Sequence, residues 1–270
     1  MKINFLHLKF GVKEDYTKSM DKETRKLDET IEGLLHPTEP PILYNLGKKW
    51  TGKGAIVEIG SWKGRSIILL TRGCTFGNSK NPKVYVVDTF KNTHEGIDLD
   101  SETLSDFKKN IKRAGVEKYI TPLIGESLVM ARGFNKPIEI LFIDGSHDYD
   151  SVYLDVDYWC EKLIEGGWVI FHDSDYYGVM KVIKEMIFSG KYSNLNYGGS
   201  IIYMQKKKGS IVQMYFALLR RKVLIGLWKD LPDGLKVFIR RLLGKQYKSA
   251  PKDVPKEFKI ENFKNKQEKV

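Results

Sequence analysis

The sequence is poor in cysteine and has no long hydrophobic run. Its two cysteines, Cys74 and Cys160, lie far apart, so they offer neither a disulfide framework nor the closely spaced thiols of a zinc site. This scarcity favours a reducing, cytoplasmic environment. No stretch approaches the roughly 20 apolar residues that span a bilayer. The N-terminus also lacks the apolar core and the small-residue cleavage site of a signal peptide.

Acidic residues are scarce in one part of the chain only. The 270 residues carry a net charge of +11 at pH 7. Residues 206–270 contain 18 Lys and Arg against six Asp and Glu, whereas residues 1–205 contain 27 against 28. A basic protein is a candidate for nucleic-acid binding, but the larger part of this chain is nearly neutral, which disfavours nucleic acid as a partner. The 41% hydrophobic and 29% charged fractions are typical of a globular protein.

The GxGxxG fingerprint of dinucleotide-binding proteins is also missing, which disfavours a nicotinamide cofactor. A different glycine turn, from Gly60 to Gly64, lies between a predicted strand at 55–59 and an apolar helix. Such a turn lets the backbone approach a ligand closely, and the helix N-terminus favours polar or anionic groups. Many α/β proteins use a similar turn for packing alone.

An acidic residue ends the next predicted strand, at residues 84–87. The carboxylate of Asp88 can accept hydrogen bonds from both hydroxyls of a ribose, and an α/β fold would bring it beside the glycine turn. The alternative is that Asp88 only begins the loop that follows.

The most informative stretch is residues 138–175. Two short apolar runs predict buried strands, of which one ends at Asp144 and the other at His172 and Asp173. Parallel strands bring their carboxyl ends to the same edge of a sheet, where ligands bind in open α/β folds. We therefore expect Asp144, His147, His172 and Asp173 to converge.

A helix is predicted between these two strands. Its apolar face is expected to consist of Val152, Val156, Trp159 and Leu163. Gly166-Gly167 is expected to end it. A strand–helix–strand unit of this kind is typical of parallel sheets.

The alternation of strands and helices predicts the fold class. We expect an α/β, doubly wound, mostly parallel seven-stranded sheet of the Rossmann-like type. Its last strand is expected to be antiparallel, because two short strands around Gly198-Gly199 close the pattern as a hairpin. Before the sheet, a helix with Met20, Leu27, Ile31 and Leu34 on one face is expected to be broken by the segment 36–41.

The chain is divided into four predicted segments. These are a helical extension at 1–45, a catalytic domain at 46–205, a basic amphipathic helical extension at 206–248 and a disordered tail at 249–270. The first extension is either a lid or an interface, or a helix that only covers the sheet.

Over residues 40–205, the order of these motifs resembles the class I S-adenosylmethionine-dependent methyltransferases. The resemblance implies that the segment from Glu58 to Ser66 cradles the methionine part of the cofactor. It also implies that Asp88 binds the ribose and that the residues after a strand at 119–124 contact the adenine. The implied cofactor-binding residues are Glu58, Gly60, Ser61, Gly64, Ser66, Asp88, Gly125, Glu126, Ser127 and Asp144.

A narrower resemblance is carried by Phe142-Ile-Asp-Gly-Ser-His-Asp-Tyr149 and by Gly166-Gly-Trp-Val-Ile-Phe-His-Asp173. Both segments resemble the metal-dependent O-methyltransferases, which include the catechol type and enzymes that act on sugar hydroxyls of macrolides and glycans. The resemblance implies a divalent ion, Mg²⁺ or Mn²⁺, bound by Asp144, His172 and Asp173. It also implies that His147 is the general base, since histidine at this position is typical of the sugar type.

One residue departs from the family pattern. His172 stands where the relatives have a carboxylate. Magnesium prefers oxygen ligands, whereas imidazole suits zinc, iron or manganese better, so the metal could differ or His172 could face elsewhere. For His147 the alternative is a loop histidine that caps the helix beginning near Asp148.

The implied chemistry needs these groups. An alcohol is a poor nucleophile, so its hydroxyl must lose a proton as the methyl group is transferred. A metal ion lowers the pKa of the hydroxyl, and a histidine that titrates near neutrality removes the proton. The predicted function is therefore S-adenosylmethionine-dependent, metal-dependent O-methylation of a sugar or glycan hydroxyl, in a small molecule or a lipid-linked sugar. The alternatives are an RNA methyltransferase and an inactive cofactor-binding or scaffold relative.

The basic C-terminal segment predicts a second kind of partner. Residues 210–245 form two apolar helical stretches with many cations, broken by Pro232-Asp-Gly234. Such a segment can lie on an anionic membrane surface, which would make the protein peripheral on the inner face of the membrane. The alternative is that its apolar faces pack on the catalytic domain or form a contact in a homo-oligomer.

Overall fold

The computed structural model describes residues 19–78, 81–94 and 97–230. The chain forms two compact units, residues 1–221 and 222–270. The first unit contains every strand of the described residues and the first half of helix α9 (Ile211–Asp230). The domain boundaries predicted at 45, 205 and 248 stay predictions, and the segment 231–270 lies outside the described residues.

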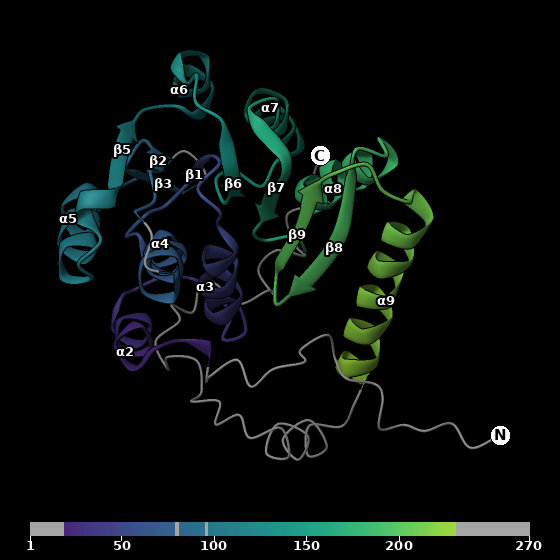
Figure 1. Cartoon of the computed structure of the whole chain (residues 1–270), viewed down its shortest axis with the longest axis horizontal. Helices are drawn as coiled ribbons and strands as arrows, with labels where there is room; N and C mark the ends of the chain where they lie inside the picture. The colour runs from purple at the N-terminus through teal and green to yellow at the C-terminus, as the bar shows by residue number, and fades with distance from the viewer. Residues whose placement is uncertain (1–18, 79–80, 95–96, 231–270) are drawn as a thin grey trace. The chain divides into compact units, whose positions relative to one another are not determined.

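A seven-stranded sheet with the order β5-β2-β1-β6-β7-β9-β8 forms the centre of the first unit (Figure 1). Its strands are β1 (Ala55–Ile59), β2 (Val84–Asp88), β5 (Ile120–Ile124), β6 (Ile138–Ile143), β7 (Leu163–Phe171), β8 (Tyr192–Gly198) and β9 (Ile201–Lys206). The first five pair in parallel, and β9 runs antiparallel to both β7 and β8. The predicted fold class is therefore confirmed, including the closing hairpin.

The central strands are buried on both faces. Every residue of β1 and of β6 is buried, as their continuous apolar runs predicted. Two further strands, β3 (Lys91–His94) and β4 (Ile97–Glu102), form a separate antiparallel hairpin after β2.

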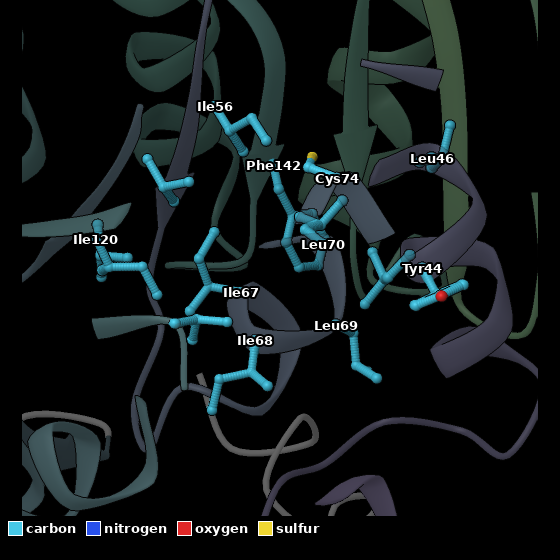
Figure 2. Packing of buried hydrophobic residues seen from close by; sticks show 14 of the residues in the cluster. Tyr44, Leu46, Ile56, Ile67, Ile68, Leu69, Leu70, Cys74, Ile120 and Phe142 are labelled. Atoms are coloured by element: carbon cyan, nitrogen blue, oxygen red, sulfur yellow. The ribbon is translucent and has the colours of Figure 1, made fainter. Parts of the chain in front are cut away.

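Helices cover both faces of the sheet (Figure 1). One face carries α2 (Lys22–Thr30), α3 (Glu39–Lys49), α4 (Arg65–Asn78) and α5 (Thr103–Arg113), and the other carries α6 (Ser127–Gly133), α7 (Tyr149–Cys160) and α8 (Tyr177–Phe188). Alternate residues of a strand face opposite sides. Thus Ile56 belongs to the core cluster of the first face and Val57 to that of the second. Figure 2 shows Ile56, Phe142 and the apolar side chains of α4 in the first cluster.

Two glycines allow α3 and α4 to pack at unusually short range. A Cβ atom on Gly73 would lie 2.1 Å from the carbonyl oxygen of Tyr44, and one on Gly47 would lie 2.1 Å from that of Leu70. The helix backbones are therefore in direct contact. This packing holds α3 against the sheet. Glu39, the first residue of α3, is held there with it.

The predicted extent of the central helix is wrong. Helix α7 ends at Cys160, and Leu163 is the first residue of β7. Leu163 pairs with Ile138, and the register then shifts before the next pair. Gly166 occupies this irregularity with a φ of +78°, a conformation that glycine adopts without strain. Leu163 would be buried at the end of a helix, as it is at the start of β7. Its apolar side chain, four residues after Trp159, therefore fitted the helical pattern.

The predicted apolar face before the sheet is correct for three residues and wrong for the fourth. Met20, Leu27 and Ile31 are buried, but Leu34 is 86% exposed because α2 ends at Thr30. The prolines in the segment 36–41 do not only interrupt a helix. Pro40 and Pro41 lie in the first turn of α3, where the missing N–H costs nothing.

No helix among the described residues is long and apolar enough to cross a bilayer.

Candidate functional site

The carboxyl ends of β2, β1, β6 and β7 lie next to one another in the sheet. Asp88 ends β2, the glycine turn follows β1, Asp144 follows β6, and His172 and Asp173 follow β7. The backbone hydrogen bonds between the strands continue into these loops. The amide of Asp144 donates to the carbonyl of Ile59 at 2.9 Å, and the amide of His172 donates to that of Ile143 at 3.1 Å. The convergence expected for this edge is therefore present.

Asp144, His172 and Asp173 form a tight cluster at this edge. One ligand atom from each lies within 4.8 Å of the others, which is close enough for a shared metal ion. Nδ1 of His172 lies 2.9 Å from Oδ1 of Asp144 and 3.2 Å from Oδ2 of Asp173. Asp173 has a φ of +49°, which is rare for a residue other than glycine and is common at functional sites.

Nδ1 of His172 is buried and has no well-directed hydrogen-bond partner among the described residues. Both carboxylate oxygens are near enough, but neither lies in the direction in which the ring nitrogen would donate. The nitrogen and the two oxygens instead surround a common position. This arrangement fits a divalent ion bound by one imidazole and two carboxylates.

Charges dominate the protonation of this cluster. Burial lowers the pKa of His172, but the carboxylate of Asp144 and the contacts with Asp173 and Glu39 outweigh it and raise the pKa well above its ordinary value. Burial raises the pKa of Asp144. Burial also acts to raise the pKa of Asp173, but its contacts with His147 and His172 outweigh this and lower the pKa. The carboxylates around His172 therefore stabilise a positive charge at this position.

His147 lies beside the cluster on the loop between β6 and α7. Its Nε2 is 3.0 Å from Oδ2 of Asp173, and its ring stacks on Tyr176 with 4.3 Å between ring centres. The side chain is 37% exposed, so it can reach both the cluster and a bound substrate. The helix is capped by a different residue: Asp148 accepts a hydrogen bond from the amide of Ser151. The capping role considered for His147 is therefore taken by its neighbour.

Glu39 also lies against the cluster, although no pattern in the sequence predicts this contact. This fully buried carboxylate begins α3, and its Oε2 lies 3.1 Å from Nε2 of His172. In the sequence it stands between a threonine and two prolines, in a segment interpreted only as a helix break. A glutamate just before Pro-Pro is a weak sign of a helix start, but no local pattern indicates its contact with His172, 133 positions away.

The glycine turn after β1 is bound to Asp88. Oδ2 of Asp88 accepts hydrogen bonds from the amides of Ser61 at 2.7 Å and Trp62 at 2.9 Å, and Oδ1 accepts one from Phe90 at 2.7 Å. Trp62 and Phe90 also have positive φ values. Gly60 is required for close packing, because a Cβ atom there would lie 2.3 Å from the carbonyl oxygen of Asp144. Asp88 thus holds the turn in place, and Oδ1, which accepts only one of these hydrogen bonds, keeps a lone pair for a ligand.

Glu58 lies beneath the same turn and is completely buried. Its Oε2 accepts a hydrogen bond from the hydroxyl of Ser61, whereas Oε1 has no partner among the described residues. Burial raises the pKa of Glu58 to about 8, and the nearby carboxylates of Asp144 and Asp88 add to the shift. A buried carboxyl with an unpaired oxygen at this place fits a cationic ligand group.

The remaining predicted contacts lie along the same edge. The amide of Gly125 donates to the carbonyl of Asp88 at 3.0 Å, so the loop after β5 lies next to Asp88. Glu126 is the exposed N-cap of α6. The hydroxyl of Ser127 is already engaged, since it donates to Asp155 and accepts a hydrogen bond from the indole of Trp159 at 2.9 Å.

Gly64 and Ser66 lie where the turn becomes α4. Gly64 has a φ of +85°, and a Cβ atom there would lie 2.8 Å from the ring of Phe107. Ser66 is buried in the first turn of α4. Both positions line the turn, and their contacts with a cofactor stay predictions.

Residues 57–174 match a family model described as a methyltransferase domain. The matched segment begins in β1 and ends just after Asp173, so it contains every residue predicted to bind the cofactor or the metal. An uncharacterised protein of Acanthamoeba polyphaga mimivirus is 27% identical over 150 residues, which are 51% of this chain and 62% of the viral protein. The chain thus spans about three fifths of that relative.

Several solved structures with a similar fold are methyltransferases. An O-methyltransferase from Bacillus cereus in complex with SAH matches with a TM-score of 0.51 and 18% identity, over 69% of this chain and 92% of its own. A methyltransferase from Podospora anserina, bound to SAH, has a TM-score of 0.54 and 11% identity, over 70% and 89%. An O-methyltransferase of tomaymycin synthesis from Streptomyces achromogenes, in complex with SAM, has a TM-score of 0.50 and 15% identity, over 73% and 92%. At these identities the likeness concerns the fold.

Proposed function

We propose that this chain transfers a methyl group to a hydroxyl oxygen with the help of a divalent ion. It contains a class I methyltransferase domain with the fold of the S-adenosylmethionine-dependent O-methyltransferases. The observation that carries the proposal is the cluster of Asp144, His172 and Asp173 beside the glycine turn. The carboxyl edge of the sheet thus combines a cofactor position and a metal position.

The groups around the glycine turn suit S-adenosylmethionine. The unpaired Oε1 of Glu58 is a buried acceptor for the ammonium group of the methionine part. The raised pKa of Glu58 means that its carboxyl retains a proton near neutral pH. When the ammonium group binds beside it, we expect this carboxyl to lose the proton, because a nearby positive charge lowers its pKa. Oδ1 of Asp88 can accept a hydrogen bond from a ribose hydroxyl while Oδ2 holds the turn.

The metal and the base act on the acceptor hydroxyl. When bound, a divalent ion lowers the pKa of the hydroxyl and orients its oxygen. Asp144, His172 and Asp173 are the residues that would bind the ion, and His147 is the nearest exposed base. Its Nε2 contacts Asp173, which holds the imidazole at the edge of the cluster, where it can accept the proton from the substrate.

The acceptor class is proposed from the base. A histidine three residues after Asp144 is typical of the relatives that methylate sugar hydroxyls, so we favour a sugar or glycan, free or lipid-linked. Magnesium and manganese are the ions that the family resemblance implies. A screen of sugar, macrolide and catechol acceptors by methyl transfer would identify the class.

Calorimetric titration with S-adenosylhomocysteine tests the cofactor half of this proposal. Binding is expected in the wild type and should be lost or weakened at least about tenfold in Asp88→Ala, because the ribose loses its acceptor and the turn its anchor. The control is Glu139→Gln, a buried carboxylate that caps the loop at residues 51–54 at the other end of the sheet. Absence of binding in the wild type would mean that only the fold is shared with the methyltransferases.

We also propose an anionic lipid surface as a partner, on the basis of helix α9. Its buried side is anchored in the core by Met214 and Leu218. Its opposite side exposes Val212, Tyr215, Phe216 and Leu219. Apolar side chains next to a strongly basic segment match the chemistry of an anionic membrane interface. A peripheral location at such a membrane would bring the enzyme to a lipid-linked sugar.

A further inference from the structure

We propose that the candidate metal site is built for a transition-metal ion rather than for magnesium, and that Glu39 is the positioning residue that makes His172 a metal ligand. The inference rests on the proposed function only in that both assign the ion to Asp144, His172 and Asp173. Glu39 lies outside the segment that matches the family model.

Glu39 is held as a hydrogen-bond acceptor. Its Oε1 accepts hydrogen bonds from the amide of Ser200 at 2.7 Å and from the hydroxyl of the same residue at 2.9 Å. Its Oε2 accepts one from the amide of His36 at 2.6 Å. Gly199 makes room for the carboxylate, because a Cβ atom there would lie 2.4 Å from Oε1. Three donors and a shaped pocket therefore keep the carboxylate in one orientation.

The orientation of Glu39 determines the role of each imidazole nitrogen of His172. Nε2 lies 3.1 Å from Oε2 of Glu39, so this nitrogen donates its hydrogen to the carboxylate. In a neutral imidazole, Nδ1 then carries the free lone pair. Nδ1 is the atom that faces Asp144 and Asp173 without a well-directed hydrogen bond. A carboxylate that orients a histidine in this way is the usual outer partner of a metal-binding imidazole.

The resulting ligand set is one nitrogen and two carboxylate oxygens. Magnesium prefers oxygen ligands alone, whereas imidazole is a good ligand for zinc, iron and other transition ions. His172 is 5% exposed, and its far nitrogen is already used by Glu39, so the ring cannot turn away to leave the position to water. The geometry thus points to manganese, iron or zinc as the ion.

Metal titration of the chelator-treated, full-length protein tests the preference. Dissociation constants for Mn²⁺, Zn²⁺ and Mg²⁺ are measured for the wild type and for His172→Asp, which replaces the nitrogen by oxygen. The ratio of the Mg²⁺ constant to the Mn²⁺ constant is expected to fall about tenfold or more in the variant. An unchanged ratio would show that His172 is not a ligand and would overturn the proposal. Failure of all three ions to bind the wild type would also overturn it.

The role of Glu39 is tested with Glu39→Gln in the same titration. Loss of such an outer partner typically weakens metal binding by about 10-fold to 100-fold. The matched control is Glu139→Gln, which also removes the charge of a buried glutamate but lies away from the cluster. Equal affinities of wild type and Glu39→Gln would leave Glu39 a purely structural residue and contradict the inference.

A spectroscopic measurement keeps the test valid if Glu39→Gln fails to fold. In zinc-loaded wild-type protein with ¹⁵N-labelled histidine, the ring of His172 is expected to carry its hydrogen on Nε2 and the metal on Nδ1. The opposite assignment would overturn the proposal. Titration of the same samples with S-adenosylhomocysteine distinguishes failure of the proposed function from failure of this inference. If the protein binds the metal ion but not S-adenosylhomocysteine, the proposed function is contradicted and the inference about the metal site is not.

Discussion

Buried carboxylates in this protein differ in what they contact. Glu139 accepts hydrogen bonds from four consecutive backbone amides, at residues 51–54. Glu39 has three donors and His172. Glu58 and Asp155 have fewer, and burial raises their pKa values to about 8 and about 6. Glu58 and Asp155 therefore retain a proton to higher pH than an ordinary carboxyl, which makes them sensitive to pH or to a cationic ligand.

Asp155 should make the stability of the fold depend on pH. A carboxyl whose folded pKa is raised stabilises the folded state below its unfolded pKa, and this contribution is lost as pH rises through the folded pKa, here from 3.8 to about 6. The loss amounts to at most about 3 kcal/mol. Asp155→Asn removes it, so the variant should gain stability relative to the wild type between pH 4 and pH 7. Urea unfolding at both pH values measures the difference.

The control for this prediction is Asp157→Asn, an exposed aspartate of the same helix. Its stability relative to the wild type should not change with pH. If Asp155→Asn also shows no pH-dependent gain, the carboxyl of Asp155 is not held in the environment described here.

At the scale of elements, the contact between α3 and α4 connects the fold with the site. Gly47 and Gly73 allow the two helices to approach until their backbones touch. Helix α3 begins with Glu39, so the packing of α3 on α4 positions Glu39 against His172, which follows β7. The candidate metal site therefore depends on two glycines that are not among its residues.

Gly73→Ala should destabilise the protein, because the new methyl group would lie 2.1 Å from the carbonyl oxygen of Tyr44. Forcing the helices apart is expected to cost about 1–3 kcal/mol of unfolding free energy. The control is Gly226→Ala in α9, where an added Cβ meets nothing within 4 Å and should be neutral or stabilising by up to about 1 kcal/mol. Equal stabilities of the two variants in urea would contradict the close crossing.

At the scale of the whole molecule, charge and exposed apolar surface are unevenly distributed. The excess of positive charge lies entirely after residue 205. The outer side of α9, at the beginning of that segment, exposes Phe216 and Val212 with exposed fractions of 64% and 62%. The combination is typical of a surface that binds anionic lipid.

Vesicle flotation tests the membrane proposal. The protein should float with vesicles that contain phosphatidylserine, bind less at high salt, and bind neutral phosphatidylcholine vesicles weakly. Phe216→Glu should reduce the bound fraction about tenfold, because the burial of an aromatic side chain is lost. The matched control is Leu34→Glu, because Leu34 is also an exposed apolar residue but is distant from Phe216 in the sequence. Equal loss in both variants, or no binding by the wild type, would exclude this surface.

Sequence patterns alone determined the strands of the sheet and the positions of Asp88, Asp144, His172 and Asp173. Continuous apolar runs define buried parallel strands locally, and the polar residue that ends each run must emerge at the carboxyl edge. The tertiary structure decided what no local pattern contains. Glu39 contacts His172 because α3 packs on α4. Leu163 belongs to β7 because it pairs with Ile138 of β6. Both outcomes depend on contacts between segments that are distant in the chain, whose geometry the spacing of neighbouring residues does not encode.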